Sequence, residues 1–253
     1  MQSKQFAIHL VCNDLRLIRR DQTLISMASF ALLIAVVLRW LLPWMNDYLA
    51  EQGILPNQST TMRLADIYPM LVTFFALFNG AQLSGAIFGF LLLDEKDQKT
   101  IEAVRVAPIS MTQFLTCRVM LPSVLAFFFC VLMILVIDQA LLPTWQVVLI
   151  SISASQLAPI MALFLANFAE NKVQGFAIAK FAGIAGWSIL LGWFVAEPTQ
   201  WLFGLFPPFL VSKSYWMALD GSAWWWPVLG LSFALQLLMV AGLVVRFRAT
   251  VAD

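Results

Sequence analysis

The residues whose types and spacing could do chemistry in this 253-residue sequence are concentrated in one segment, residues 94 to 110. Seven charged side chains fall within the twelve residues 94 to 105, and four of them are acids and three are bases. None can work with a nearby histidine, because the only histidine of the chain is His9. We therefore expect this segment to bind a protein partner and not to catalyse a reaction.

The second half of the segment has the pattern of a short helix. Asp97 or Thr100 can cap its N-terminus. Ile101 and Val104 then share one face, because residues three positions apart are neighbours on a helix. Pro108 ends the helix, since the residue before a proline avoids the helical conformation.

Charged residues of the same short helix flank its apolar face. Glu102 and Arg105 are placed to pair on another face. A short helix with a small apolar face and a charged rim fits a groove on a soluble partner. The alternative is a solvated turn, although four acids against three bases follow the positive-inside rule poorly.

Sequence signs of catalysis or cofactor binding are lacking elsewhere. There is no phosphate-binding loop, dinucleotide fingerprint or EF-hand loop. A single histidine does not support zinc-protease or Ser-His chemistry. The three cysteines have neither metal-binding nor CxxC spacing, and we interpret them as apolar fillers. We expect no catalytic residue, no metal and no cofactor.

The elements that must position this segment are membrane spans. The chain is 61% hydrophobic and only 11% charged, with a mean hydropathy of +0.85. A helical span needs about 20 apolar residues, and backbone groups in lipid must be satisfied within a helix. The sequence therefore predicts an all-α polytopic membrane protein, a single domain over residues 1 to 253. Its six spans are expected at about 23–44, 67–93, 114–137, 144–166, 175–196 and 226–245.

Lys and Arg residues are distributed unequally between the two sides of these spans. With a cytoplasmic N-terminus, twelve fall inside and only Arg39, Arg63 and Lys213 fall outside. The positive-inside rule then predicts that the N- and C-termini are both cytoplasmic. The net charge of +1 gives no indication of a nucleic-acid partner.

Ionisable residues within the spans lie near the span ends. Arg39 and Asp138 are near outer ends, and Arg118 and Lys180 are near inner ends, so we expect each to reach water or headgroups. No acidic residue accompanies the prolines of the third and fourth spans. Ion-coupled transport would normally place a carboxylate there, so any uphill transport would draw its energy from outside the membrane part.

Amphipathic and turn-rich segments flank the spans. Residues 6 to 20 place apolar side chains on one arc and cationic or polar ones on the other, which predicts an interfacial helix in the cytoplasmic headgroup layer. This helix could be a simple anchor or could have a mechanical role. In the outer segments 46–66 and 197–225 we expect short helices resting at the outer surface.

The segment 94–110 resembles the coupling region of permease subunits of type 2 ABC exporters. The matching positions are Glu95-Lys96, Thr100-Ile101-Glu102 and Pro108, and Lys99 stands where the family usually has Gly. The turn that begins Asn171-Lys172-Val173 is similar to the family's turn between spans four and five. Both loops are most similar to the fluoroquinolone-export permease subgroup.

The resemblance implies a subunit that itself does no chemistry. A dimer with a second permease, identical or paralogous, would form the pathway, and a separate ABC ATPase subunit would drive it from the cytoplasm. The protein would be a multi-pass protein of the bacterial inner or plasma membrane, in contact with lipid. The residues implied in ATPase contact are Glu95, Lys96, Thr100, Ile101, Glu102, Val104, Arg105 and Pro108, and Asn171 and Lys172 would form a second cytoplasmic turn.

Other functions remain open on the sequence. A membrane scaffold or assembly factor could bind a soluble partner through the same loop without transport. A haem-exporter-like permease would need a haem-handling outer surface, and no outer histidine exists. The substrate is not indicated, because the phenylalanine-rich spans are as expected for packing in lipid.

Overall fold

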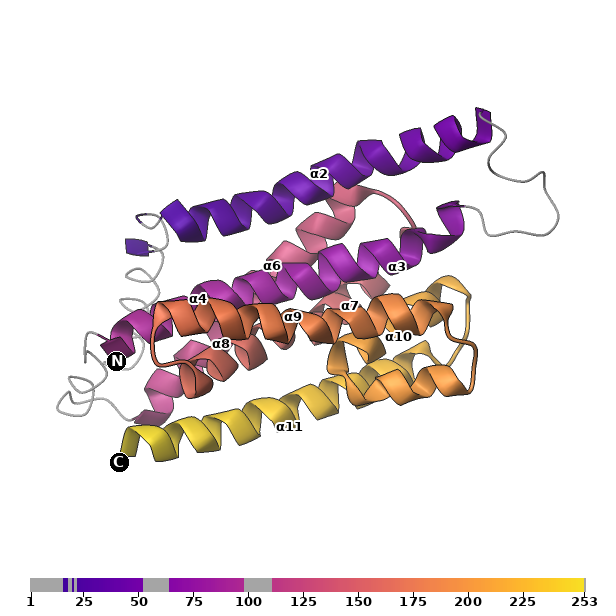
Figure 1. Cartoon of the computed structure of the whole chain (residues 1–253). Helices are drawn as coiled ribbons and strands as arrows, with labels where there is room; N and C mark the ends of the chain where they lie inside the picture. Colours follow the sequence, from indigo (N-terminus) through magenta and orange to yellow (C-terminus); the bar gives the residue numbers. More distant parts are fainter. Residues whose placement is uncertain (1–15, 18–19, 21, 52–63, 98–110, 253) are drawn as a thin grey trace.

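The computed structural model describes residues 16–17, 20, 22–51, 64–97 and 111–252. In these ranges the regular elements are all helical (Figure 1). The α-helices are α2 (Gln22–Glu51), α3 (Tyr68–Val72), α4 (Gly80–Asp97), α6 (Met111–Ile137), α7 (Thr144–Ser155), α8 (Leu157–Phe168), α9 (Lys172–Phe194), α10 (Pro207–Leu219) and α11 (Trp225–Ala252). Two 3-10 helices, η1 (Leu64–Ile67) and η3 (Thr199–Leu205), and a π-helix, η2 (Thr73–Asn79), complete them.

Six helical segments of the described chain are long and apolar enough to cross a membrane, which confirms the six predicted spans. They are Leu24–Leu49, Ala65–Lys96, Leu115–Ile137, Thr144–Phe168, Lys172–Phe194 and Trp225–Ala249. The predicted interfacial helix at 6–20 lies outside the described residues except at Arg16, Leu17 and Arg20, and stays a prediction.

The second and fourth spans form the centre of the bundle. Within their apolar windows, 83% and 67% of the residues are buried, against 22% to 33% in the other four spans. Gly85 brings α4 against α8, because a Cβ atom there would lie 2.4 Å from the Ala158 carbonyl oxygen. Close approach through small residues is how helices pack in lipid, where no hydrophobic force drives them together.

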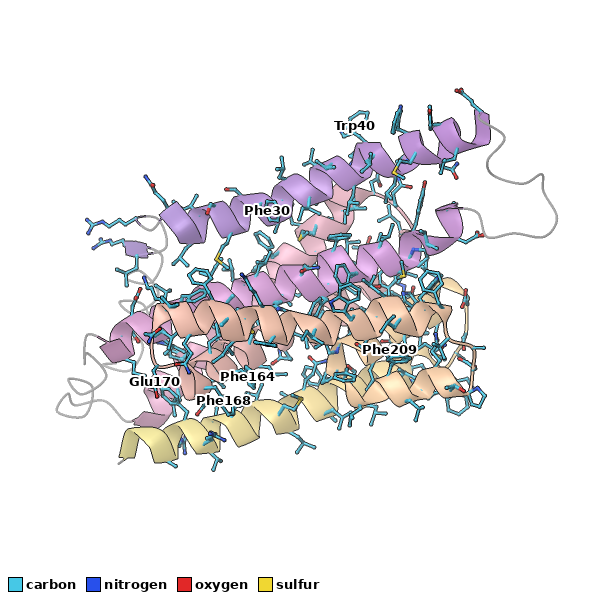
Figure 2. All side chains as sticks on the ribbon, in the orientation of Figure 1. Phe30, Trp40, Phe164, Phe168, Glu170 and Phe209 are labelled. Carbon is cyan, nitrogen blue, oxygen red and sulfur yellow. The ribbon has the colours of Figure 1, made fainter. Side chains whose placement is uncertain are left out.

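The outer helices present apolar side chains away from the centre. On α2, Phe30 is 59% and Trp40 is 72% exposed, and Trp40 points away from the bundle in Figure 2. Exposed aromatic and aliphatic residues of this kind suit a surface in contact with lipid or with another membrane helix. Phe209 on α10, by contrast, is fully buried.

Both central spans have irregular middles. The second changes to a π-helix over Thr73–Asn79, and the Asn79 side-chain amide donates a hydrogen bond of 2.9 Å to the Phe74 carbonyl there. The fourth is broken at Gln156, so that Pro159 falls in the first turn of α8, where its missing N–H is tolerated.

Short helices form within residues 197 to 225 as predicted, but one of them, α10, is buried and does not rest at the outer surface. Eleven residues of α10 are buried, and its first carbonyl, that of Pro207, accepts a 3.5 Å hydrogen bond from Ser232, which lies two turns into α11. The η3–α10 segment therefore folds back into the bundle. Hydropathy could not distinguish a helix at the membrane surface from a helix inside the bundle, because a short apolar helix suits both environments equally well.

One end of the bundle collects the parts that the sequence places on one side. The start of α2, the end of α4, the start of α6, the α8–α9 turn and the end of α11 lie together at the left of Figure 1. We call this the α4–α6 end. The loop of residues 98 to 110, which joins α4 to α6, lies outside the described residues.

Candidate coupling site

The predicted partner-binding residues are divided between described and undescribed parts of the chain. Glu95 and Lys96 lie in the last turn of α4, and Asn171 and Lys172 lie where α9 begins. Thr100, Ile101, Glu102, Val104, Arg105 and Pro108 lie outside the described residues, so their arrangement stays a prediction.

Three consecutive side chains at the end of α4 contact three different elements. The Asp94 carboxylate pairs with the Lys172 ammonium on α9 at 2.9 Å. The Lys96 ammonium donates a 3.3 Å hydrogen bond to the Ala169 carbonyl, just after α8. Between them, Glu95 pairs with Arg118 on α6. Successive helical residues are rotated by about 100°, so three neighbours can point to three sides.

The Glu95–Arg118 pair is the most enclosed part of this junction. Arg118 is 1% exposed, and its guanidinium donates to the Glu95 carboxylate. This corrects the expectation that Arg118 reaches water or headgroups. A buried charge without a partner is very costly, so the acid at the end of α4 satisfies the arginine on α6. The two helices joined by the 98–110 loop are thus held together at its base.

The start of α9 is fixed by two reciprocal hydrogen bonds. Asn171 is the N-cap, and its side-chain oxygen accepts a 3.0 Å hydrogen bond from the Gln174 backbone N–H. The Gln174 side chain in turn accepts one of 2.7 Å from the Glu170 N–H, in an arrangement close to a capping box. Glu170 marks this turn in Figure 2. The cap places Lys172 where it meets Asp94.

The chemistry of this junction is structural and ionic. Its members are carboxylates and cations, without a nucleophile paired to a base. Among the described residues, no group of three or more His, Cys, Asp or Glu side chains could hold a metal ion. The arrangement connects the last turn of α4, where the 98–110 loop begins, to α6, α9 and the end of α8. We name the set Asp94, Glu95, Lys96, Arg118 and Lys172 the loop-base junction.

The sequence was compared with families of known proteins. A family model described as "Fluoroquinolones export permease protein Rv2686c-like" matches residues 14–244, most of the chain. The protein belongs to this permease family. It is thus a multi-pass protein of the cell membrane with a role in transport, as its six spans also indicate.

Two curated proteins show the same relationship over nearly their full length. The permease is 28% identical over 242 residues to the fluoroquinolones export permease protein Rv2686c of Mycobacterium tuberculosis strain H37Rv, covering 94% of this chain and 92% of the relative. It is similar to the same extent to the protein MT2760 of strain CDC 1551, which has the same description. The resemblance stated from the two loops is therefore confirmed at the level of the family.

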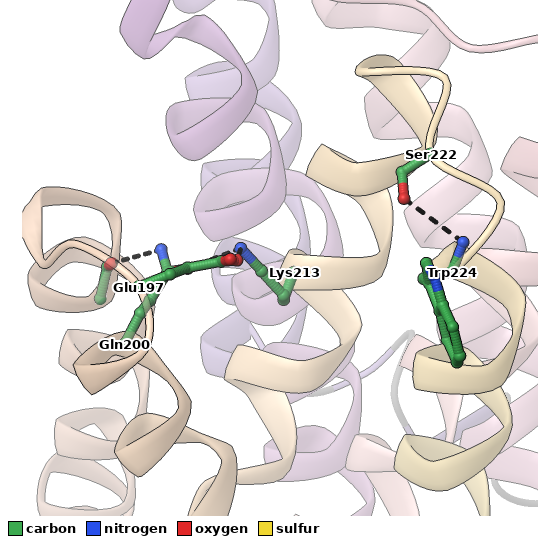
Figure 3. A network of polar contacts seen from close by, with 6 residues as sticks. Glu197, Gln200, Lys213, Ser222 and Trp224 are labelled. Carbon is green, nitrogen blue, oxygen red and sulfur yellow. Dashed lines mark hydrogen bonds and ion pairs between the residues drawn. The ribbon is translucent and has the colours of Figure 1, made fainter.

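The opposite end of the permease holds a second buried cation, which the sequence did not indicate. Lys213 counts in the sequence as an outer charge, yet it is 9% exposed. Its ammonium lies 2.5 Å from the Glu197 carboxylate and 2.6 Å from the Gln200 side-chain oxygen (Figure 3). Because Gln200 also donates to the Gly192 carbonyl at 2.7 Å, the network ties α10 to the end of α9. The spacing of these polar residues gave no signal of this contact.

A partly exposed ion pair joins α2 to the residue after α6, in agreement with the expectation that both groups reach solvent. Arg39 on α2 pairs at 3.0 Å with Asp138, which directly follows α6, and the two side chains are 42% and 45% exposed. Arg39 also donates to the Val136 carbonyl at 3.1 Å. Asp138 lies just beyond the end of its span, whereas Arg39 lies ten residues before the end of Leu24–Leu49, because α2 extends further than the predicted first span. The sequence did not predict that the two would pair.

Proposed function

We propose that the permease is the membrane subunit of an ATP-driven ABC exporter, and that residues 94 to 110 couple it to a separate ATPase. In this proposal two permeases, identical or paralogous, form the substrate pathway. The ATPases close on ATP beneath them and displace the 98–110 loop. The family relationship supports the transport role, and the loop pattern supports the coupling.

The observation that carries the proposal is the loop-base junction. A force applied to the loop reaches α4 first, and Glu95 passes it to α6 through Arg118. Asp94 and Lys96 connect the same turn to α9 and to the end of α8. A small displacement of the loop is thereby shared among four helices, because packed elements move as bodies and do not deform continuously.

Orientation and pairing are proposed from the charge distribution and the exposed faces. The α4–α6 end carries the excess of Lys and Arg, so it faces the cytoplasm. The outward side chains of α9, such as Phe181 at 70% and Trp187 at 57% exposed, give a second permease an apolar face to pack against. The substrate is an amphipathic aromatic molecule, in line with the fluoroquinolones named for the relatives.

Co-purification with the ATPase tests the coupling. Ile101→Asp together with Val104→Asp places two charges on the predicted apolar face, and we expect loss of ATPase co-purification and of ATP-driven transport. Ala249→Asp, on an exposed position near the end of α11, is the matched control and should retain both. Unchanged co-purification and transport in the double variant would refute the coupling proposal. A complex that forms without any ATP hydrolysis would instead support the non-transporting scaffold.

A further inference from the structure

A half-open cavity of about 250 Å³ lies between α9 and α11, on one side of the bundle. Both helices pack on α8, which forms the floor of the cavity with Met161 and Phe164. Phe164 is labelled between these helices in Figure 2. Met239, more than three turns into α11, lines one side, so the cavity is remote from both ends of the spans.

The folded-back η3–α10 segment closes one end of this cavity. Its turn, residues 205 to 208, contributes to the lining, and Leu205 and Phe206 within it are 84% and 42% exposed. If this face of the bundle contacts lipid, these two exposed apolar side chains give a membrane-dissolved molecule a path of access to the cavity from the bilayer.

Small residues on α9 create the space. Ala182 and Ala185 face the cavity, where larger side chains would fill it. At the next residue, Gly186, the Phe78 ring is packed so closely on the helix that a Cβ atom there would lie 2.2 Å from the ring. The aromatic wall is thus held in place by the backbone of α9.

The lining is apolar with one polar exception. None of its residues is charged, so the site favours an uncharged ligand, because an ion would lose its hydration without a partner. Gln82 is the one amide in the lining, and its nitrogen donates a 3.4 Å hydrogen bond to the Ala179 carbonyl. A side-chain amide carries two N–H donors, so a second remains for a ligand acceptor.

We propose that this cavity binds uncharged, flat, two-ring aromatic molecules that enter from the bilayer and carry one hydrogen-bond acceptor for Gln82. The aromatic walls Phe78 and Phe164 match flat rings, and Met161 and Met239 are adaptable side chains suited to varied ligands. An engineered apolar cavity of about 150 Å³ holds one benzene ring, so the volume here suits two fused rings. The site deepens the proposed function, on which its role in substrate recruitment rests.

Binding of tritiated coumarin to the permease alone in lipid nanodiscs tests the site. Coumarin is uncharged and two-ringed and has one carbonyl acceptor, and empty nanodiscs give the lipid background. Ala182→Leu with Ala185→Leu should weaken specific binding at least tenfold. Ala177→Leu, at an exposed position of the same helix, should leave it unchanged.

The variant Gln82→Leu tests whether the cavity recognises a hydrogen-bond acceptor or takes up any apolar molecule. It should weaken coumarin binding about fivefold, the value of one hydrogen bond, and should leave binding of tritiated naphthalene within twofold of the unsubstituted protein. Retained naphthalene binding also shows that this variant is folded.

Three results would overturn the inference: no specific coumarin binding, equal binding in the double leucine variant, or equal loss of both probes in Gln82→Leu. Absence of specific coumarin binding would indicate that a lipid chain fills the cavity. Because the assay contains neither ATPase nor ATP, it can fail while Ile101→Asp with Val104→Asp still abolishes coupling, and the reverse also holds.

Discussion

At the scale of single residues, the permease relies on two cations that are buried beside acids from other elements. Arg118 and Lys213 are 1% and 9% exposed, and Glu95 and Glu197 pair with them. The sequence placed Arg118 near a span end and Lys213 in an outer segment but did not predict either pair, because the partners are 23 and 16 residues apart along the chain. Glu95 was singled out for a partner subunit, and the structure gives it an internal role as well.

The buried arginine gives the sharpest stability prediction at this scale. Arg118→Met leaves Glu95 without its cation in an enclosed site, and we expect a loss of about 3 to 5 kcal/mol in the free energy of unfolding. Adding Glu95→Gln should restore part of this loss. Arg39→Met, which removes a pair more than two fifths exposed, should cost less than about 1 kcal/mol. Denaturant unfolding in detergent micelles measures all three, and equal losses for Arg118→Met and Arg39→Met would contradict the account.

At the scale of elements, apolar runs were enough to predict the six spans but not their internal breaks. The run of residues 144 to 166 reads as one span, yet the structure divides it at Gln156 into α7 and α8. Hydropathy averages over a whole window and does not report a local change of hydrogen bonding. For the same reason hydropathy did not predict the burial of α10, which depends on contacts with α9 and α11.

The contact of α4 with α8 gives the prediction for elements. Gly85→Ala puts a methyl group 2.4 Å from the Ala158 carbonyl oxygen, so the two central helices must separate. We expect a fall in thermal stability large enough to reduce the folded yield. Gly230→Ala is the matched control, because nothing lies within 4 Å of a Cβ atom there and alanine is the better helix former. Fluorescence-detected size-exclusion chromatography after heating measures the folded fraction of both variants. Equal stability of Gly85→Ala and Gly230→Ala would show that α4 and α8 do not approach each other so closely.

At the scale of the whole molecule, coupling to an ATPase requires that the α4–α6 end of the bundle meets the cytoplasm. Six spans return the chain to the side on which it started, and in Figure 1 the start of α2 and the end of α11 lie at one end. In the proposed orientation, which follows from the excess of Lys and Arg, that end faces the cytoplasm. The substrate and the number of permeases in the complex could not be predicted from the sequence, because neither leaves a local pattern.

Reporter fusions test this orientation. Green fluorescent protein fused after residue 252 should fluoresce, and alkaline phosphatase at the same site should be inactive, because the phosphatase folds only outside the cytoplasm. The phosphatase inserted within residues 52 to 63 should be active, since the end of α2 and the start of η1, which flank this insertion point, lie at the opposite end of the bundle (Figure 1). The reverse pattern of activities would place the 98–110 loop outside the cell and exclude an ATPase at that loop.

The central claim is that the 98–110 loop is the part of the permease that meets the ATPase. Site-specific photocrosslinking tests it most directly, with p-benzoylphenylalanine replacing Ile101 in cells that also contain the ATPase. The control carries the same group at Leu202, which is 76% exposed at the opposite end. We predict a crosslinked product of permease and ATPase from position 101 and none from position 202. Absence of the product at 101, or equal products at both positions, would contradict the account.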